Sequence, residues 1–250
     1  MKIAVINFSG NVGKSTLARH LLVPRIPDAE LIAIESVNAG EGPSAILRGD
    51  QFAALQEYLH SIPSAVVDIG ASSVQEFLQL MQEYRGSQKD FDCFVVPCVP
   101  PQKQQQDTIA TLVDLSDLGV PPERLRVVFN MIEPRIPVEQ AFYLVRDFLA
   151  EHPIAVASPT CQLRRNEIYA RIRGKQGKDA DLVVLAQDDT DYVRLIGQAP
   201  DSAEKMALAQ QLATCRLASS VVAQLDACFA GLDLPKPRID QIDSSVGATP

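Results

Sequence analysis

The chain has 250 residues, of which 46% are hydrophobic, and a formal net charge of −8. This composition predicts one sizeable globular domain and excludes both a disordered chain and a polycation that binds nucleic acid through its overall charge. No apolar run approaches the roughly 20 residues of a membrane-spanning helix, and the apolar run at the start of the chain is not followed by a signal-peptide cleavage site.

The cysteines and histidines argue against covalent or zinc cross-links. Five cysteines are scattered along the chain without a CxxC pair, and the three histidines lie far apart. A disulfide framework or a zinc site normally needs clustered or paired ligands. We therefore expect reduced, mostly buried thiols and a cytoplasmic protein.

Apolar strand-like runs alternate with helix-like segments in the first half of the chain. The predicted strands are residues 3–6, 31–34 and 65–68, and the predicted helices are residues 14–22, 50–58 and 73–84. Asp50 is expected to cap the second helix. Ser73, followed three residues later by Glu76, fits a capping box that opens the third helix.

The alternation continues and then becomes less regular. Further strands are predicted at residues 94–96, 127–129, 154–157 and 182–185, and helices near 108–118, at 138–149 and at 202–229. Such alternation predicts an α/β fold with a mainly parallel sheet and helices on both faces. Residues 1–234 are expected to form one domain that includes the C-terminal helices, and residues 235–250 a flexible tail.

The segment between the first predicted strand and the first helix carries the strongest motif. It reads Ser9-Gly10-Asn11-Val12-Gly13-Lys14-Ser15-Thr16. Such a loop directs backbone N–H groups at an anion, and the helix start adds its positive end. Lys14 is expected to reach the β- and γ-phosphates of ATP, and the Ser15 hydroxyl to bind Mg²⁺. The predicted nucleotide-binding residues are Gly10, Asn11, Val12, Gly13, Lys14, Ser15 and Thr16.

The general P-loop pattern, GxxxxGK[ST], is not fully met, because Phe8 stands at its first glycine. The alternative is an ordinary strand–turn–helix junction. That alternative would leave Lys14 exposed at the positive end of a helix, which is unfavourable unless an anion binds there. We therefore favour phosphate binding.

An acidic residue ends the third predicted strand, where residues 65–67 are apolar and Asp68 follows. In P-loop proteins a carboxylate at this place holds a magnesium-bound water or orients the attacking one. The alternative is an aspartate that merely precedes a turn. We take Asp68 as a catalytic residue together with Lys14, and as a Mg²⁺ ligand together with Ser15.

The loop resembles the KGGxGK[ST] loop of the ParA/MinD group of deviant Walker-A ATPases, with Gly10 at the first glycine and Ser9 at the signature lysine. The resemblance covers roughly residues 1–200 and is strongest to the ParA-like ATPases of plasmid stability operons, the StbB type. It implies a P-loop NTPase fold that binds ATP and Mg²⁺. In the family the signature lysine crosses a dimer interface to the partner's nucleotide, so Ser9 predicts weak hydrolysis.

The resemblance also implies two further site residues. Glu35 matches the first acid of the family's DxD pattern and is a catalytic candidate, whereas Val37 replaces the second acid and cannot orient water. Asn130 follows an apolar strand at the place of the asparagine that binds adenine, and its amide can donate to and accept from a base. The alternatives are a surface acid at a strand end and a turn-forming asparagine.

The implied partners are a small plasmid-encoded DNA-binding protein, which acts in plasmid partition, stability or conjugation, and a second copy of the chain in an ATP-dependent homodimer. Direct DNA contact is expected from the basic stretch 164–178, where Ile168 and Ile172 can anchor the segment to the core. A solvated charged face is the alternative. The residues expected to contact DNA are Arg164, Arg165, Arg171 and Arg173.

Two other functions fit the same motifs. A nucleotide sensor would bind ATP with little hydrolysis, as Ser9 and Val37 favour. A dethiobiotin-synthetase-like ligase would use the same fold, but it needs a second substrate pocket with its own polar groups. No such constellation is evident in the sequence.

Overall fold

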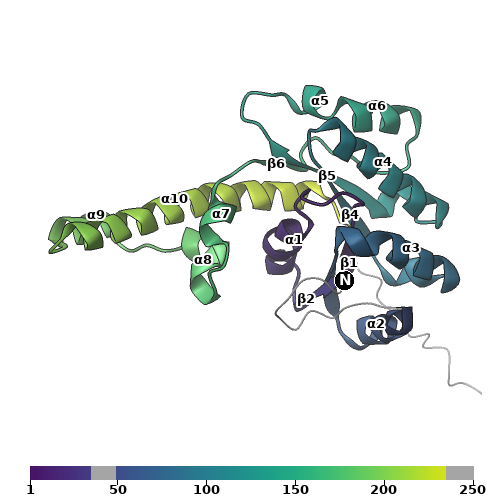
Figure 1. Cartoon of the computed structure of the whole chain (residues 1–250), viewed down its shortest axis with the longest axis horizontal. Coiled ribbons are helices and arrows are strands. Elements are labelled where there is room, and N and C mark those ends of the chain that lie inside the picture. Colours follow the sequence, from purple (N-terminus) through teal and green to yellow (C-terminus); the bar gives the residue numbers. More distant parts are fainter. Residues whose placement is uncertain (35–48, 235–250) are drawn as a thin grey trace, which may run out of the picture.

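A computed structural model describes residues 1–34 and 49–234 of the chain (Figure 1). In these ranges six strands form one sheet in the order β2-β3-β1-β4-β5-β6, and every neighbouring pair is parallel. The predicted parallel sheet is therefore confirmed. The strands are β1 (Lys2–Val5), β2 (Ala29–Ile34), β3 (Ser64–Ile69), β4 (Cys93–Cys98), β5 (Leu125–Ile132) and β6 (Gln162–Arg164).

The central strands are continuous apolar runs because both faces of the sheet are covered. Every residue of β3 and β4 is buried. One face carries α2 (Gly49–Ser61), α3 (Val74–Glu83), α4 (Gln102–Asp117), α5 (Val138–Ala141) and α6 (Tyr143–Glu151), which enclose an aromatic core. Its large side chains include Phe52, Phe77, Phe94, Phe129 and Phe142.

The opposite face carries the helices that flank the phosphate loop and those of the last third of the chain. These are α1 (Lys14–Thr16), its continuation η1 (Leu17–Leu22), α7 (Ile168–Ile172), α8 (Leu182–Ala186) and α10 (Ser202–Gly231). Helices thus cover both faces, as predicted. Short 3-10 turns at Val23–Arg25, Ala71–Ser73, Ser87–Asp90, Pro122–Arg124 and Gly177–Asp179 connect the larger elements.

Helix α10 is long and only partly packed on the sheet. All of its buried residues lie between Thr214 and Cys228, and its first half runs beside α9 (Tyr192–Gln198), away from the sheet (Figure 1). Asp201 caps its start by accepting a hydrogen bond from the Glu204 N–H. Its other end is held by the buried Arg126 of β5, which donates to two carbonyl oxygens just beyond the helix.

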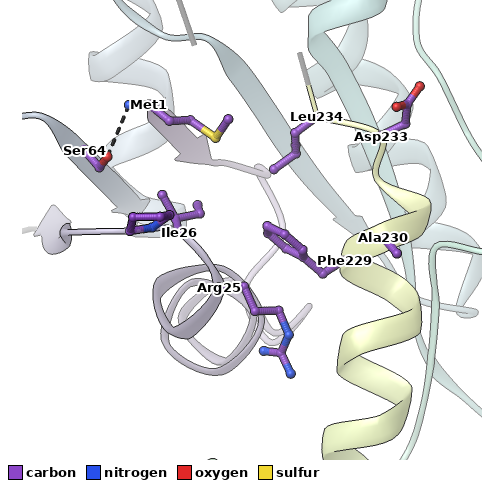
Figure 2. Close-up of a pocket in the computed structure, with 9 residues that line it drawn as sticks. Met1, Arg25, Ile26, Ser64, Phe229, Ala230, Asp233 and Leu234 are labelled. Carbon is purple, nitrogen blue, oxygen red and sulfur yellow. Dashed lines mark hydrogen bonds between the residues drawn. The ribbon is translucent and has the colours of Figure 1, made fainter. Parts of the chain in front are cut away.

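The C-terminal end of α10 lies near the start of the chain, at the amino ends of the strands (Figure 2). A mostly apolar cavity of about 490 Å³ is found there, bounded by Met1, Ile26 and Phe229. The terminal amine donates to the Pro63 carbonyl oxygen at 2.8 Å. The phosphate loop lies at the opposite end of β1, so this cavity is separate from it.

Two predicted strands are wrong. Residues 182–185 form helix α8, because the Asp181 side chain accepts hydrogen bonds from the N–H groups of Val183 and Val184 and so caps a helix. Residues 154–157 contribute one isolated bridge, between Val156 and Arg126. Pro153, which has no N–H to donate, precedes that stretch directly, and the sixth strand follows later as β6.

Two predicted helix caps and one predicted helix also need correction. Asp50 lies inside α2, which begins at Gly49. Ser73 does precede α3, but among the described contacts its side chain makes no capping hydrogen bond, because the residue is held in a 3-10 turn with helical backbone angles. The helix predicted at 138–149 breaks at Phe142, whose ring packs on Phe129 at a centroid distance of 4.7 Å.

All five cysteines lie in the described ranges; each is buried, and none is in a disulfide. Burial raises the pKa of Cys93 and Cys98 to about 12. In the same ranges, no group of three or more acidic, histidine or cysteine side chains is arranged to hold a metal ion. None of the helices described there has both the length and the apolar character needed to cross a bilayer.

Candidate phosphate-binding site

The predicted phosphate loop joins the carboxyl end of the central strand β1 to α1. Asn11 and Gly13 have positive φ angles of 57° and 90°, so the backbone turns sharply just before the helix. A Cβ atom on Gly13 would lie 2.4 Å from the Asn130 side-chain nitrogen. Position 13 therefore requires glycine for two reasons, its backbone angles and the close approach of the Asn130 side chain from β5.

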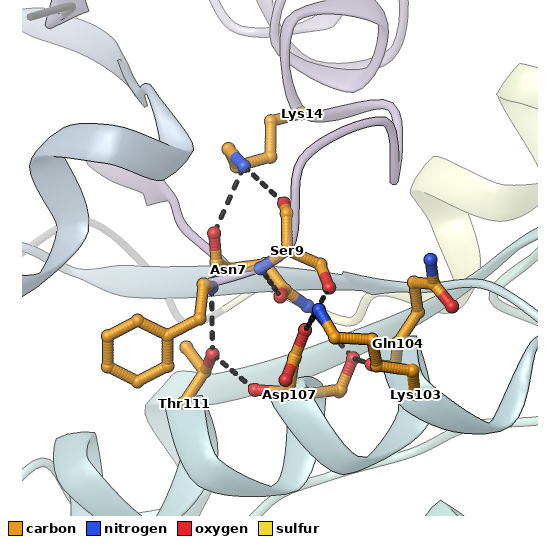
Figure 3. Close-up of polar contacts among 9 residues, drawn as sticks. Asn7, Ser9, Lys14, Lys103, Gln104, Asp107 and Thr111 are labelled. Carbon is orange, nitrogen blue, oxygen red and sulfur yellow. Dashed lines mark hydrogen bonds and ion pairs between the residues drawn. The ribbon is translucent and has the colours of Figure 1, made fainter.

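Lys14 is buried within this loop. Its ammonium group donates to the carbonyl oxygens of Asn7 at 3.0 Å and Ser9 at 2.7 Å (Figure 3). Burial lowers the pKa of Lys14 to about 8, and the negative charge of Asp68 only partly opposes this effect. A cation that is desolvated in this way is stabilised when an anion binds beside it. The geometry therefore supports a site for a phosphate group.

Asp68 is brought next to this lysine by the strand order. It lies opposite Val5 in the β1–β3 register and is buried, with 6% of its surface exposed. Ser15 is exposed on the first turn of α1. A hydroxyl and a carboxylate are oxygen donors of the kind that Mg²⁺ prefers, so Ser15 and Asp68 fit the predicted metal site chemically.

Helix α4 anchors the first half of the loop, which the sequence reasoning missed. The Asn7 amide donates to the Thr108 hydroxyl at 2.8 Å, and the Phe8 N–H donates to the Thr111 hydroxyl at 3.1 Å. The Ser9 hydroxyl donates to the carboxylate of Asp107 (Figure 3). A signal was present, because positions 107, 108 and 111 share one face of a helix.

Ser9, which stands at the family's signature lysine, faces into the protein. It is buried, with 6% of its surface exposed, and Asp107, its partner, also forms an ion pair with Lys103 at 3.5 Å. This side chain stabilises the loop and carries no charge toward another subunit. The geometry thus explains how the loop is held without a lysine at this position.

Asn130 at the end of β5 holds the second half of the loop. Its amide nitrogen donates to the Val12 carbonyl oxygen at 2.9 Å, and its amide oxygen accepts from the Met131 N–H. In this arrangement the side chain positions the loop backbone. Contact with a base, which the sequence predicts for Asn130, stays a prediction.

The basic stretch 164–178 lies beside the loop. A cavity of about 580 Å³ is lined by Thr16, Asn130 and Met131 on one side and by this stretch on the other. Ile168 and Ile172 are buried in the core, which confirms their predicted anchoring role. From the basic stretch the cavity is lined by Arg164, Arg165, Asn166, Glu167, Tyr169, Ala170 and Arg173.

Three of the four arginines predicted to contact DNA already have partners. Arg164 donates to the Pro134 carbonyl oxygen, Arg165 pairs with Glu133 at 3.5 Å, and Arg171 pairs with Glu167 at 3.2 Å. These contacts are on the surface and leave the guanidinium groups accessible. Glu35, the remaining predicted catalytic residue, and Val37 lie outside the described residues.

Comparisons with known proteins add little to this description. No family model matches the chain, and no curated protein matches it. Solved structures that it resembles include a complex of a Cyanothece McdA variant with ATP, at 13% identity and a TM-score of 0.45, over 85% of this chain and 96% of that one. The parallel sheet is an α/β fold, and its glycine-containing loop joins the carboxyl end of β1 to α1, the strand–loop–helix arrangement in which phosphate loops occur.

The lowered pKa of Lys14 predicts that affinity for ATP declines above pH 8. Lys14 of the empty protein loses its proton near that pH, whereas bound phosphates raise the pKa of Lys14. Between these two pKa values, ATP binding is therefore coupled to the uptake of one proton by Lys14. Affinity should then fall by up to about tenfold for each pH unit above 8. Fluorescent-ATP titrations from about pH 7 to pH 9.5 measure this, with Lys14→Arg, which stays protonated, as the control. If log ATP affinity falls with pH above 8 at the same slope in the wild-type protein and in Lys14→Arg, the prediction is contradicted.

Proposed function

We propose that the chain is a ParA/MinD-like ATP-binding switch ATPase. The observation that carries this proposal is Lys14, a desolvated cation held by carbonyl oxygens of a loop between the central strand and a helix, with Asp68 close by. Burial of a lysine is unfavourable, the charge of Asp68 offsets this only in part, and a bound triphosphate relieves it further. The arrangement supports ATP as the ligand through its phosphates.

Each predicted residue has a distinct role in this proposal. Lys14 exchanges the Asn7 and Ser9 carbonyl oxygens for the β- and γ-phosphates, and the backbone N–H groups of Gly10 to Gly13 surround the phosphates. Ser15 and Asp68 would hold Mg²⁺, which would neutralise charge on the phosphates. Asn130 lines the cavity of about 580 Å³ in which we place the base, and Glu35 orients the attacking water.

The switch follows from the position of these groups. Gain and loss of the γ-phosphate change the charge beside Asp68 and the loop after β3, and so change affinity for a partner. The partner we propose is a small plasmid-encoded DNA-binding protein in plasmid stability, partition or conjugation. An ATP-dependent homodimer and DNA contact through Arg164, Arg165, Arg171 and Arg173 are part of the same proposal.

We expect the isolated protein to hydrolyse ATP slowly, well below the turnover of about 1 s⁻¹ at the low end of typical enzymes. The physical reason is that Ser9 is turned toward Asp107 and supplies no cation to a neighbouring nucleotide. Steady-state phosphate release measures turnover alone and with added DNA. Brisk turnover without any partner would contradict the expectation.

The matched variant changes Arg164, Arg165, Arg171 and Arg173 together to alanine. It should lose DNA stimulation of ATP hydrolysis and show a shallower salt dependence of DNA binding, since each phosphate contact contributes about −0.9 to the slope of log affinity against log salt.

The two alternative functions predict different outcomes of the phosphate-release assay. A sensor binds ATP without turnover under every condition, and a ligase turns over only when a small metabolite is added.

A further inference from the structure

A second cavity, of about 300 Å³, lies on the outer side of α1 and η1, where the chain after α7 faces them. We call it the flanking cavity. Ser15, Thr16 and Arg19 line it from the helix, and Arg173 and Lys175 line it from the opposite side. It shares Thr16 and Arg173 with the larger cavity beside Asn130, but neither Lys14 nor Gly13 lines it.

Three cations line the flanking cavity: Arg19, Arg173 and Lys175. In the ranges that the structure describes, no ion pair is formed by Arg19, Arg173 or Lys175. The nearby arginines Arg165 and Arg171, by contrast, are each paired with a glutamate. Three cations without an ion pair among the described residues surround one cavity, in a chain of net charge −8, and form a local positive potential that attracts anions.

The walls of the flanking cavity are held in place by the core. Ile172, which is 5% exposed, anchors the end of α7 directly before Arg173. Gly174 has a φ angle of 78°, so the chain turns between Arg173 and Lys175, and both residues still line the cavity. His20 and Tyr169 also line it, with their ring centroids 5.8 Å apart. The cations therefore line the cavity from two sides, Arg19 from η1 and Arg173 and Lys175 from the chain after α7.

We propose that the flanking cavity is a second anion subsite, which adjoins the phosphate loop at Ser15 and Thr16, for a small molecule that carries two or more phosphate groups. Its volume is at the lower end of ligand pockets, about 300–1,000 Å³, and so suits a small ligand. Guanidinium groups form paired hydrogen bonds with phosphate oxygens. Arg19 and Arg173 supply two such groups, and Lys175 adds a third charge.

The test uses pyrophosphate as the probe and isothermal titration calorimetry as the measurement. In a Lys14→Ala protein the phosphate loop is disabled, and pyrophosphate should still bind. Adding Arg19→Ala or Lys175→Ala should weaken that binding at least about tenfold, the loss expected for one hydrogen bond to a charged group. Arg85→Ala, which removes an exposed arginine after α3 on the other face of the sheet, should have no effect.

A second titration with pyrophosphate does not depend on the Lys14 variant. Wild-type protein saturated with a non-hydrolysable ATP analogue should bind one further pyrophosphate, and Arg19→Ala should weaken it while Arg19→Lys weakens it less. Thermal unfolding checks that each variant is folded. The proposal is overturned if the protein saturated with the ATP analogue binds no pyrophosphate. It is equally overturned if neither Arg19→Ala nor Lys175→Ala changes the affinity for pyrophosphate. It is also overturned if these residues affect only a single-stranded oligonucleotide, because the cavity then serves nucleic acid.

Discussion

Lys14→Ala is expected to weaken ATP binding by about a hundredfold or more while the protein stays folded. The ammonium group now bonds to two loop carbonyl oxygens, and in the bound state it would make charge-assisted hydrogen bonds to the phosphates. Such bonds contribute about 1.5–3 kcal/mol each, so the loss of two corresponds to a factor of a hundred or more. Fluorescent-ATP titration of the wild-type and variant proteins measures the change.

The control for this prediction is Lys14→Met, which keeps the volume of the buried side chain. The pKa of Lys14 is lowered from 10.5 to about 8 in the folded protein, so the protonated lysine destabilises the empty protein below pH 8. That cost disappears as the pH rises from 8 toward 10.5. Lys14→Met should therefore bind ATP as poorly as Lys14→Ala, with wild-type or higher stability at pH 7. Unchanged ATP affinity in either variant would rule out the phosphate site.

Five of the six strands could be located from the sequence within one to three residues at each end. The central ones are buried on both faces and read as nearly continuous apolar runs, such as β3 and β4, whereas the edge strand β2 is partly exposed. Helix α8 shows the limit of this reasoning. Its apolar core, from Leu182 to Leu185, has the composition of a strand, and the deciding interaction is the capping by Asp181. Short apolar runs of this kind fit both structures.

One part of the candidate site could likewise be predicted from the sequence, and another part could not. The loop from Ser9 to Thr16 is a local motif, and its sequence is sufficient to place it between a strand and a helix. The groups that hold the loop are far away in the chain. Asp107 and Asn130 contact it across 98 and 118 positions, and only the strand order brings them together. The same applies to the basic stretch, which reaches the loop because β6 is next to β5.

Gly13→Ala is expected to destabilise the protein by about 2–4 kcal/mol and to abolish ATP binding at the loop. A left-handed backbone at φ 90° costs a residue with a Cβ about 1–2 kcal/mol. The added methyl group would also lie 2.4 Å from the Asn130 amide nitrogen, which donates to the Val12 carbonyl oxygen. Displacing that amide loses a buried hydrogen bond, which adds about 1 kcal/mol or more. Urea denaturation and ATP titration measure the two effects.

Gly10→Ala is the matched control, because a Cβ at position 10 meets no atom within 4 Å and the φ angle is not positive. Its effect on stability should stay within about 1 kcal/mol. A double variant, Gly13→Ala with Asn130→Ala, separates the two causes. The smaller side chain removes the clash but leaves the backbone strain, so the double variant should be less destabilised than the sum of the two single variants. If Gly13→Ala is as stable as Gly10→Ala, the loop does not depend on the contact between Gly13 and Asn130.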